Sequence, residues 1–325
     1  MKVSKTQFKN LIKCRRYAAL YELYSEKDEA IVSTHTNNEV DVLMSFENKA
    51  NIQMLLNEMY DDQNDIDLIN IKDEQLEIML PFYNKLELIV GDIIKRRFGG
   101  KVIYDVDTYK QKQFSYLKDD YEFYCFLDGY QEDEDVIRIF ETKTTTSSKF
   151  DIKNFNFNIN DEKETFFINI NDIYYPYNDF YDVSESSNYS KKEESLFDRF
   201  NDKGKYVYDL IYQRNVIRNS IKSNKRIEYY LVVLNHEYIY DGKVDGLKEP
   251  IYDDSIVRFY DMTSIVNKSD DLIEADINTV IKRLNEMDSN PHPISKDCKR
   301  GGEVCMFYNI CYSEFPKENS IFTYL

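Results

Sequence analysis

Apolar and polar positions alternate with a helical period in the first part of the chain. Ser4 and Gln7 have the spacing of a capping box, and apolar side chains follow them on one helical face. Residues 37–98 are acidic and continue in a helical pattern, which a Gly-Gly pair ends. The pattern therefore predicts a helical region over residues 1–100.

From residue 101 the pattern changes to short runs of alternating apolar and polar residues, which are typical of strands. An acidic turn between the last two runs predicts that they form an antiparallel hairpin. The segment at about 144–200 is rich in Ser, Asn, Asp and Tyr, and we expect an irregular insertion with one strand in it. The predicted strands are 102–106, 121–127, 136–143 and, in the insertion, 165–170, and the turn is 131–135.

The last third of the chain again alternates between the two periods. It predicts a helix over 203–221, strands over 229–234 and 256–261, and a helix over 272–287 that ends before Asn290-Pro291. Strands alternating with helices indicate an α/β fold. We expect its core to span 101–288, followed by a segment, 289–325, that contains three of the five cysteines.

The composition is that of a globular protein, because 42% of the residues are hydrophobic and 15% are aromatic. A formal net charge of -17 argues against a protein that coats nucleic acid without specificity. It leaves room for a local basic groove, since Lys and Arg gather in three segments, 9–16, 95–101 and 214–226. An equally good interpretation is that these cations only solvate the surface.

No apolar run approaches the roughly 20 residues that cross a bilayer, and the basic first residues are not followed by an apolar segment. We therefore expect a cytoplasmic protein without a membrane partner. In the cytoplasm, cysteines are more often metal ligands or reactive thiols than disulfide partners.

The strongest chemical signal is a pair of carboxylates and a lysine on the predicted hairpin. Glu141 and Lys143 are two residues apart and so point to the same face of a strand, and Asp128 falls opposite Glu141. Carboxylate oxygens bind Mg²⁺ or Mn²⁺, which activates water for phosphodiester hydrolysis. The competing interpretation is an ordinary surface hairpin with an ion pair worth about 0–1 kcal/mol.

The sequences FLDGY and IFETK around these residues resemble motifs II and III of the PD-(D/E)xK nucleases. The similarity is to the RecB-like iron-sulfur branch, which includes the CRISPR-associated adaptation exonuclease and the AddB nuclease domain. It implies a restriction-endonuclease-like core, a mixed central sheet flanked by helices. In it, Asp128 and Glu141 would bind Mg or Mn, and Lys143 would assist the nucleophile. The helix YVYDLIYQRNVI would supply Gln213 to orient the site.

Two positions depart from the pattern of that branch. Val216 stands where the helix usually has a tyrosine, and Gly91, in LELIVGDIIKRRFGG, stands where motif I usually has a histidine metal ligand. Glu87, one turn earlier, is an alternative metal ligand. A glutamate that simply faces solvent is the competing interpretation.

Four cysteines resemble the iron-sulfur clasp of the same branch. Cys298, Cys305 and Cys311 lie in DCKRGGEVCMFYNIC, and Cys14 lies near the start of the chain. Four thiolates suit a 4Fe-4S cluster or, alternatively, zinc. The resemblance implies a structural 4Fe-4S cluster that joins the two ends of the chain. The competing interpretation is that the cysteines are independent buried thiols, and this interpretation suits Cys125. His236 and His292 are alternative ligands, although lone histidines usually serve packing.

The leading hypothesis is thus a nuclease that acts on single strands or ends of DNA, with the basic segments 95–101 and 214–226 along the phosphate backbone. One alternative is a catalytically inactive module of the same fold that binds nucleic acid or assembles a complex. Another is a zinc-stabilised interaction protein whose acidic surface serves a protein partner. Similar bacterial proteins of unknown function often continue into a ribonuclease-H-like domain, which we do not expect here.

Overall fold

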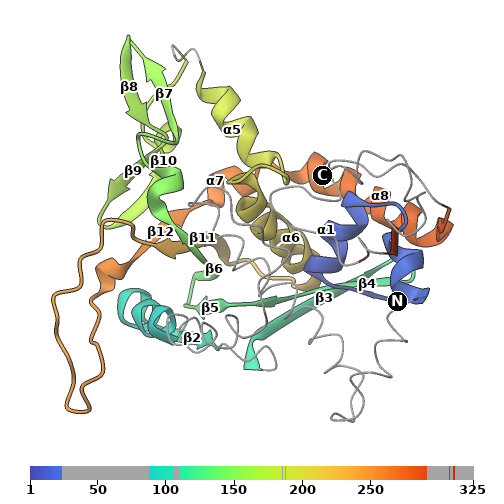
Figure 1. Cartoon of the computed structure of the whole chain (residues 1–325), viewed down its shortest axis with the longest axis horizontal. Helices are drawn as coiled ribbons and strands as arrows, with labels where there is room; N and C mark the ends of the chain where they lie inside the picture. The colour runs from blue at the N-terminus through green and yellow to red at the C-terminus, as the bar shows by residue number, and fades with distance from the viewer. Residues whose placement is uncertain are drawn as a thin grey trace, which may run out of the picture. The chain divides into compact units, whose positions relative to one another are not determined.

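A mixed sheet of seven strands organises the middle of the chain (Figure 1). The computed structural model describes residues 1–23, 88–105, 110–184, 186, 188–290, 307 and 310–311. The order in the sheet is β2 (Lys101–Tyr104), β5 (Gly129–Glu132), β6 (Val136–Thr146), β11 (Arg226–Leu234), β12 (Val257–Asp261), β10 (Ile173–Pro176) and β9 (Phe167–Ile170). The structure is therefore a mixed α/β fold, as the sequence predicts.

Two compact units divide the chain: Met1–Lys2 with Lys72–Ile273, and Val3–Ile71 with Glu274–Leu325. The seven-stranded sheet belongs to the first unit. No helix within the described ranges is both long enough and apolar enough to cross a membrane.

The central strands β6 and β11 run parallel, whereas β5 and β6 run antiparallel. Parallel neighbours need a long crossover connection, and the helix α6 (Gly204–Ser220) is part of it. Along the chain, the helix at 88–98, β2, β5, β6, α6 and β11 occur in this order, with other elements between β2 and β5 and between β6 and α6.

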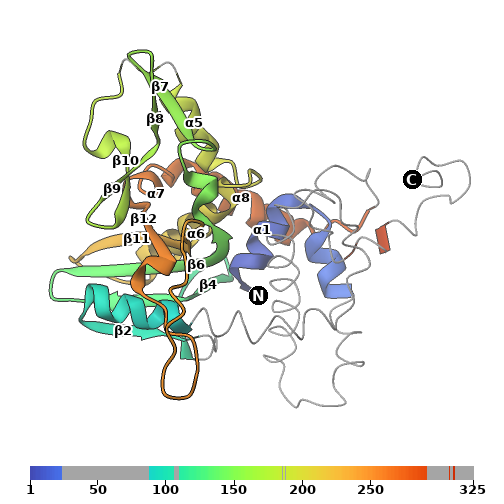
Figure 2. The ribbon, with the colours of Figure 1, turned by 60° about the vertical axis from the view of Figure 1, so that its left-hand side comes forward.

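Helices cover both faces of the central strands (Figure 2). Phe140 on β6 and Val232 on β11 pack with Ile93 and Ile94 of helix 88–98 in one buried cluster. Because side chains alternate along a strand, the neighbouring Glu141 points to the other face, where it bonds to α6. Helix 88–98 ends at Gly99 and Gly100, whose positive φ angles of 64° and 67° suit glycine.

The predicted hairpin needs one correction. The partner of β6 is β5, and the strand at 121–127, β4 (Tyr121–Leu127), pairs instead with β3 (Lys112–Lys118), which the pattern did not predict. The chain changes sheets at Asp128-Gly129. A Cβ at Gly129 would lie 2.9 Å from the Cβ of Phe140, so the close approach of β5 to β6 requires glycine. The first half of the acidic stretch 131–135 is strand, and only the residues after Glu132 turn.

Three hairpins turn on pairs of Asn or Asp with positive φ. They are Asp119-Asp120 between β3 and β4, Asn160-Asp161 between β7 (Asn156–Ile159) and β8 (Glu162–Thr165), and Asn171-Asp172 between β9 and β10. Two-residue turns of this kind match the twist of the paired strands. Asn and Asp tolerate the left-handed conformation better than other residues with side chains.

The insertion is more regular than its composition suggests. Between β6 and α6 it contains four strands, β7 to β10, the helix α5 (Tyr189–Phe197) and two short 3₁₀ helices, Ser147–Phe150 and Tyr177–Asp179. Stacked and edge-on aromatic rings fill its interior, including Phe155, Phe157, Phe166 and Tyr189. Buried aromatic residues thus form the core of this segment. We expected an irregular segment because aliphatic residues are scarce in it.

The second unit contains α1 (Lys5–Lys13), with the predicted capping box: Ser4 and Gln7 exchange side-chain to backbone bonds. Arg283 of α8 (Asp270–Glu286) donates to the carbonyl groups of Leu11 and Ile12 at the end of α1. These bonds satisfy carbonyls that a helix end leaves without partners. Short elements complete the fold: β1 (Lys2–Val3), α7 (Thr263–Val266) and the 3₁₀ helix Asp254–Ile256.

Candidate active site

The predicted lysine is held between two buried carboxylates. The Lys143 Nζ atom lies 2.9 Å from Glu141 Oε1 on β6 and 2.9 Å from Asp209 Oδ2 on α6. The side chains of Glu141 and Asp209 are each 1% exposed, and that of Lys143 is 13% exposed. Gln213 donates from Nε2 to the second oxygen of Glu141. We call Glu141, Lys143, Asp209 and Gln213 the carboxylate–lysine cluster.

Two simple periodicities produce this cluster. Glu141 and Lys143 share one face of β6 because they are two residues apart. Asp209 and Gln213 share one face of α6 because they are four residues apart. The helix packs on the face of the sheet to which β6 presents these side chains, so polar groups from both elements meet in an otherwise apolar interior.

Asp128 lies beside the cluster at the change of sheets. Its Oδ2 atom accepts a hydrogen bond of 2.9 Å from the backbone N–H of Thr142. Since Gly129 pairs with Phe140, the register carried one residue further places Asp128 opposite Glu141, as the sequence predicts. Asp128 is half-buried, whereas Glu141 is buried.

Burying these charged and polar groups lowers the stability of the fold. Two carboxyl groups surround a single amine, and each carboxyl group taken out of water needs partners to offset its lost hydration. The Oε1 atom of Gln213 is also buried and has no hydrogen-bond partner in the described part of the chain. Such arrangements cost stability and gather at functional sites.

The donor set partly fits a hard divalent cation. Asp128 and Glu141 offer carboxylate oxygens, and the unpartnered Gln213 Oε1 offers an amide oxygen of the kind that such cations accept. Across the described ranges, no three His, Cys, Asp or Glu side chains are arranged to hold a metal ion. The predicted ligand Glu87 lies outside the described residues.

The ring of Tyr104 occupies the space beside Gly91, the position at which motif I usually has a histidine. A Cβ at Gly91 would lie 2.6 Å from Cδ1 of Tyr104, and the hydroxyl of Tyr104 donates to Thr142 Oγ1 at 3.2 Å. Tyr104 thus occupies the space in which a histidine at position 91 would have to begin. Helix 88–98 also covers the face of the sheet opposite Glu141.

No protein-family model, curated protein or solved structure matches the chain. The functional proposals therefore depend on the residues and their geometry.

Sequence reasoning missed Asp209. A signal was present, since Asp209 interrupts the apolar run YVYDLIYQ and stands four residues before Gln213. An acidic residue on the buried face of a helix requires a partner, and Lys143 is that partner.

The cysteines are described only in part. Cys14 is the C-cap residue of α1, directly after the helix in which we expected it, and Cys311 is half-buried. The Nη1 atom of Arg16 lies 3.5 Å from Cys311 Sγ, and the rings of Tyr17 and Phe307 are in contact, so the segment after α1 meets the cysteine-bearing segment. Cys298, Cys305 and His292 lie outside the described residues. Cys125 is buried within β4, in agreement with a packing role.

Carboxylates pair with most of the arginines in two of the three predicted basic segments. In 95–101, Arg96 pairs with Asp254 and Arg97 lies 3.9 Å from Asp172. In 214–226, Arg214 and Arg218 both bond to Asp270, Lys225 pairs with Glu132 and Arg226 with Glu228. These contacts favour the interpretation that the cations of both segments form ion pairs with carboxylates of the same chain rather than a binding groove.

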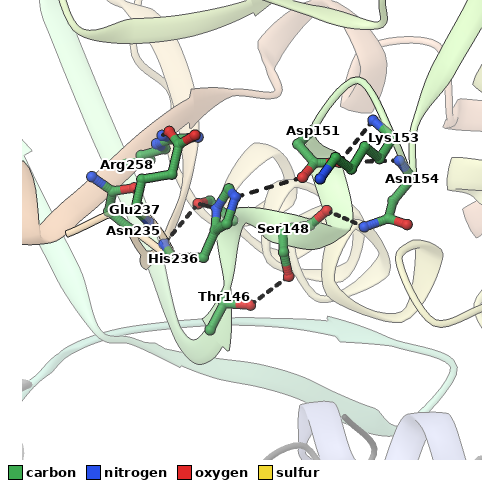
Figure 3. A network of polar contacts seen from close by, with 10 residues as sticks. Thr146, Ser148, Asp151, Lys153, Asn154, Asn235, His236, Glu237 and Arg258 are labelled. Carbon is green, nitrogen blue, oxygen red and sulfur yellow. Dashed lines mark hydrogen bonds and ion pairs between the residues drawn. The ribbon is translucent and has the colours of Figure 1, made fainter.

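A second polar network lies directly after the end of β6 (Figure 3). The Ser147 Oγ atom accepts a bond of 3.1 Å from the backbone N–H of His236 and lies 2.7 Å from its Nδ1 atom. The Nε2 atom of His236 lies 3.5 Å from Asp151 Oδ2. Ser147 is fully buried, and its hydroxyl is engaged with His236. We call Ser147, His236 and Asp151 the serine–histidine network.

Proposed function

We propose that the protein is a metal-dependent nuclease that hydrolyses phosphodiester bonds of DNA, with its site at the carboxylate–lysine cluster and Asp128. The observation that carries the proposal is the buried Lys143 between Glu141 and Asp209, with Gln213 on the far side of Glu141. A structural ion pair needs only one carboxylate for one amine. The additional buried polar groups suit a site that handles charge.

The order of elements supports the same class. A helix, three strands paired antiparallel in succession, a crossover helix and a parallel strand form the core. A mixed central sheet flanked by helices is what the resemblance to the PD-(D/E)xK nucleases implies. Glu141 and Lys143 lie on the third of those strands, β6.

Each residue has a defined task in this proposal. Asp128, Glu141 and the oxygen of Gln213 would hold Mg²⁺ or Mn²⁺, which when bound lowers the pKa of a coordinated water molecule. Lys143 would place its ammonium group beside the phosphate and offset developing negative charge. Asp209 anchors Lys143 from the helix side and fixes where its amine lies.

The test is cleavage of end-labelled single- and double-stranded DNA with Mg²⁺, with Mn²⁺ or with EDTA. The wild-type protein should cut only with metal. Asp128→Asn, which keeps the shape of the side chain, should lower the rate at least about a hundredfold. Asp270→Asn, a carboxylate on the surface, is the matched control and should cut like wild type. Absence of cleavage by folded wild-type protein under all conditions would refute the proposal.

A second candidate is a nuclease fold that has lost activity and binds nucleic acid or assembles a complex. The ring of Tyr104 at the motif I position favours it. It predicts DNA binding that Glu141→Gln leaves unchanged, without any cleavage. Zinc-stabilised interaction through the acidic surface predicts neither binding nor cleavage.

We also propose that Cys14, Cys298, Cys305 and Cys311 hold a structural 4Fe-4S cluster. The contact of Arg16 with Cys311 Sγ supports it, since hydrogen bonds to sulfur commonly surround metal-bound thiolates. Iron and acid-labile sulfide in anaerobically purified protein, both lost in Cys14→Ser, would agree. Zinc without sulfide would favour the zinc alternative at the same cysteines.

A further inference from the structure

Exposed apolar side chains gather in the connection between β11 and β12. We call residues 235–253 of this connection the β11–β12 arm, and it projects away from the sheet in both views (Figures 1 and 2). Ile239 and Leu247 are each 85% exposed, and Val244 and Ile251 are 52% and 48% exposed. Large apolar side chains that are exposed together mark sites of interaction, whereas single ones are ordinary surface.

The fold does not require an arm at this place. The strands β11 and β12 are antiparallel neighbours and stay paired up to Leu234 and Val257. A turn of two residues is enough to join such neighbours. Connections as long as this one are uncommon in compact domains and are usually functional.

The arm has a folded tip and an anchored base. At the tip, one carboxylate oxygen of Asp245 accepts hydrogen bonds of 2.8 and 2.9 Å from the backbone N–H groups of Leu247 and Glu249. At the base, Tyr238 and Tyr252 pack against the buried cluster that includes helix 88–98. The turn therefore presents Leu247 in a defined position, which reduces the entropy lost when a partner binds.

The charge of the arm distinguishes between the possible occupants. The arm contains five carboxylates and two lysines, and it stays negative when Arg258, the partner of Glu237, is counted with it. Nucleic acid and anionic lipid surfaces carry negative charge themselves. A second copy of the chain would bring another net charge of -17. Charge complementarity favours a basic protein instead.

The arm leaves the sheet near the candidate active site. Val233 of β11 pairs with Lys143 of β6 in the parallel ladder, and the arm begins two residues after Val233. A partner on the arm would therefore lie at the end of the sheet where β6 and β11 finish.

We propose that the β11–β12 arm inserts Ile239 and Leu247 into an apolar pocket of a second protein whose rim is basic. The inference goes beyond the proposed function and does not depend on it. A few central apolar anchors carry most of the affinity in such an interface, and the charges around them make binding weaken with salt.

The experiment uses photo-crosslinking of the full-length protein in its native cells. The crosslinking residue p-benzoylphenylalanine replaces Leu247 in one protein and Asp161 in the matched control. Asp161 is exposed at the polar turn between β7 and β8. The protein joined to position 247 is identified by mass spectrometry and purified.

Isothermal titration calorimetry then measures the affinity of this purified protein for wild type and for two double variants. The test variant is Ile239→Asp with Leu247→Asp. The matched control is Leu117→Asp with Ile152→Asp, which adds the same charge at two other exposed apolar positions. Thermal unfolding checks that both variants are folded.

Position 247 should give an adduct with a basic protein that position 161 does not give. That protein should bind the test variant at least about tenfold more weakly than wild type, bind the control variant like wild type, and bind more weakly as salt rises. Adducts only with a second copy or with nucleic acid, no adduct beyond the control position, or equal affinity for wild type and the test variant would each overturn the proposal. None of these outcomes bears on DNA cleavage, which tests the proposed function separately.

Discussion

The carboxylate–lysine cluster and the serine–histidine network lie one after the other along β6 and the 3₁₀ helix that follows it, yet they differ in what their polar groups do. In the network, the Ser147 hydroxyl and the ring and backbone of His236 satisfy one another, and its members bind the end of β6 to the loop after β11. In the cluster, two buried carboxyl groups compete for one amine, and a buried amide oxygen has no hydrogen-bond partner among the described residues.

The comparison distinguishes buried polar groups that stabilise the fold from buried polar groups that reduce its stability. Hydrogen bonds between buried polar groups offset the lost hydration of those groups. Buried charged groups cost more to remove from water and are often retained where chemistry requires them. The serine, histidine and aspartate of the network are typical catalytic residues by type, but Ser147 and His236 satisfy one another, whereas the cluster leaves Gln213 Oε1 without a hydrogen-bond partner among the described residues.

The largest effect is expected for Lys143→Met. It leaves Glu141 and Asp209 buried without their shared cation, so the free energy of unfolding in urea should fall by about 3–5 kcal/mol. Adding Asp209→Asn to the same protein should recover part of that loss, because it removes one of the two buried negative charges that Lys143 contacts. Equal stability of the single and double variants would mean that the three groups are not coupled.

Ser147→Ala tests the network. The backbone N–H and Nδ1 of His236 lose a buried partner, and the expected loss of unfolding free energy is about 1–3 kcal/mol in urea. Ser148→Ala is the matched control, since the Ser148 hydroxyl bonds only to the side chain of Thr146 among the contacts shown in Figure 3, and it should cost less than Ser147→Ala. A similar loss in both would argue that the network has no special structural role.

Asp261→Asn probes a largely buried carboxylate outside the cluster, which accepts a hydrogen bond from the backbone N–H of Thr263. Burial raises the pKa of Asp261 above its usual range. Stability linked to its protonation is therefore present below the unfolded pKa and is lost as the pH rises through the folded pKa. At pH 7 the asparagine variant should be more stable than wild type, by about 1 kcal/mol or less, and this gain should shrink as the pH falls toward about 4.

Asp270→Asn should respond to pH in the opposite sense. Its hydrogen bond to Arg214 holds the pKa of Asp270 below its usual range. Its contribution is present above the unfolded pKa and is lost as the pH falls through the folded pKa. Urea unfolding of both variants from about pH 2.5 to about pH 8 covers both pKa ranges and checks the two signs, and identical pH profiles would contradict them.

The smallest effect is expected for Arg218→Ala. Arg218 is exposed, and Asp270 keeps Arg214 as a second partner. The change in unfolding free energy should be about 0–1 kcal/mol. A larger loss would show that the basic segment 214–226 stabilises the fold more than surface ion pairs do.

The sequence predicted those parts of the site that depend on local periodicity. Two-residue spacing placed Glu141 and Lys143 on one face of β6, and the position of the turn placed Asp128 opposite Glu141. It did not predict Asp209, because the partner of Lys143 lies on a helix 66 residues further along, and only packing of α6 on the sheet decides which of its residues meets β6.

The same limit applies to the fold. The strands of the core and the last helix follow their patterns, but β3 and the pairing of β4 depend on contacts between segments rather than within them. In the insertion, the order comes from aromatic rings such as Phe155 and Phe166, which a pattern based on aliphatic residues underrates. The predicted metal ligand Glu87 and two of the four cluster cysteines lie outside the described residues, so these remain predictions.

The most direct test compares Glu141→Gln with Ser147→Ala in one assay, metal-dependent cleavage of labelled DNA, with unfolding in urea measured on the same preparations. We expect Glu141→Gln, which keeps the shape of the side chain, to abolish cleavage with little change in stability, whereas Ser147→Ala should lower stability and still cut. If Glu141→Gln still cleaves DNA and folded Ser147→Ala does not, the proposed site is wrong and the active site lies at the serine–histidine network.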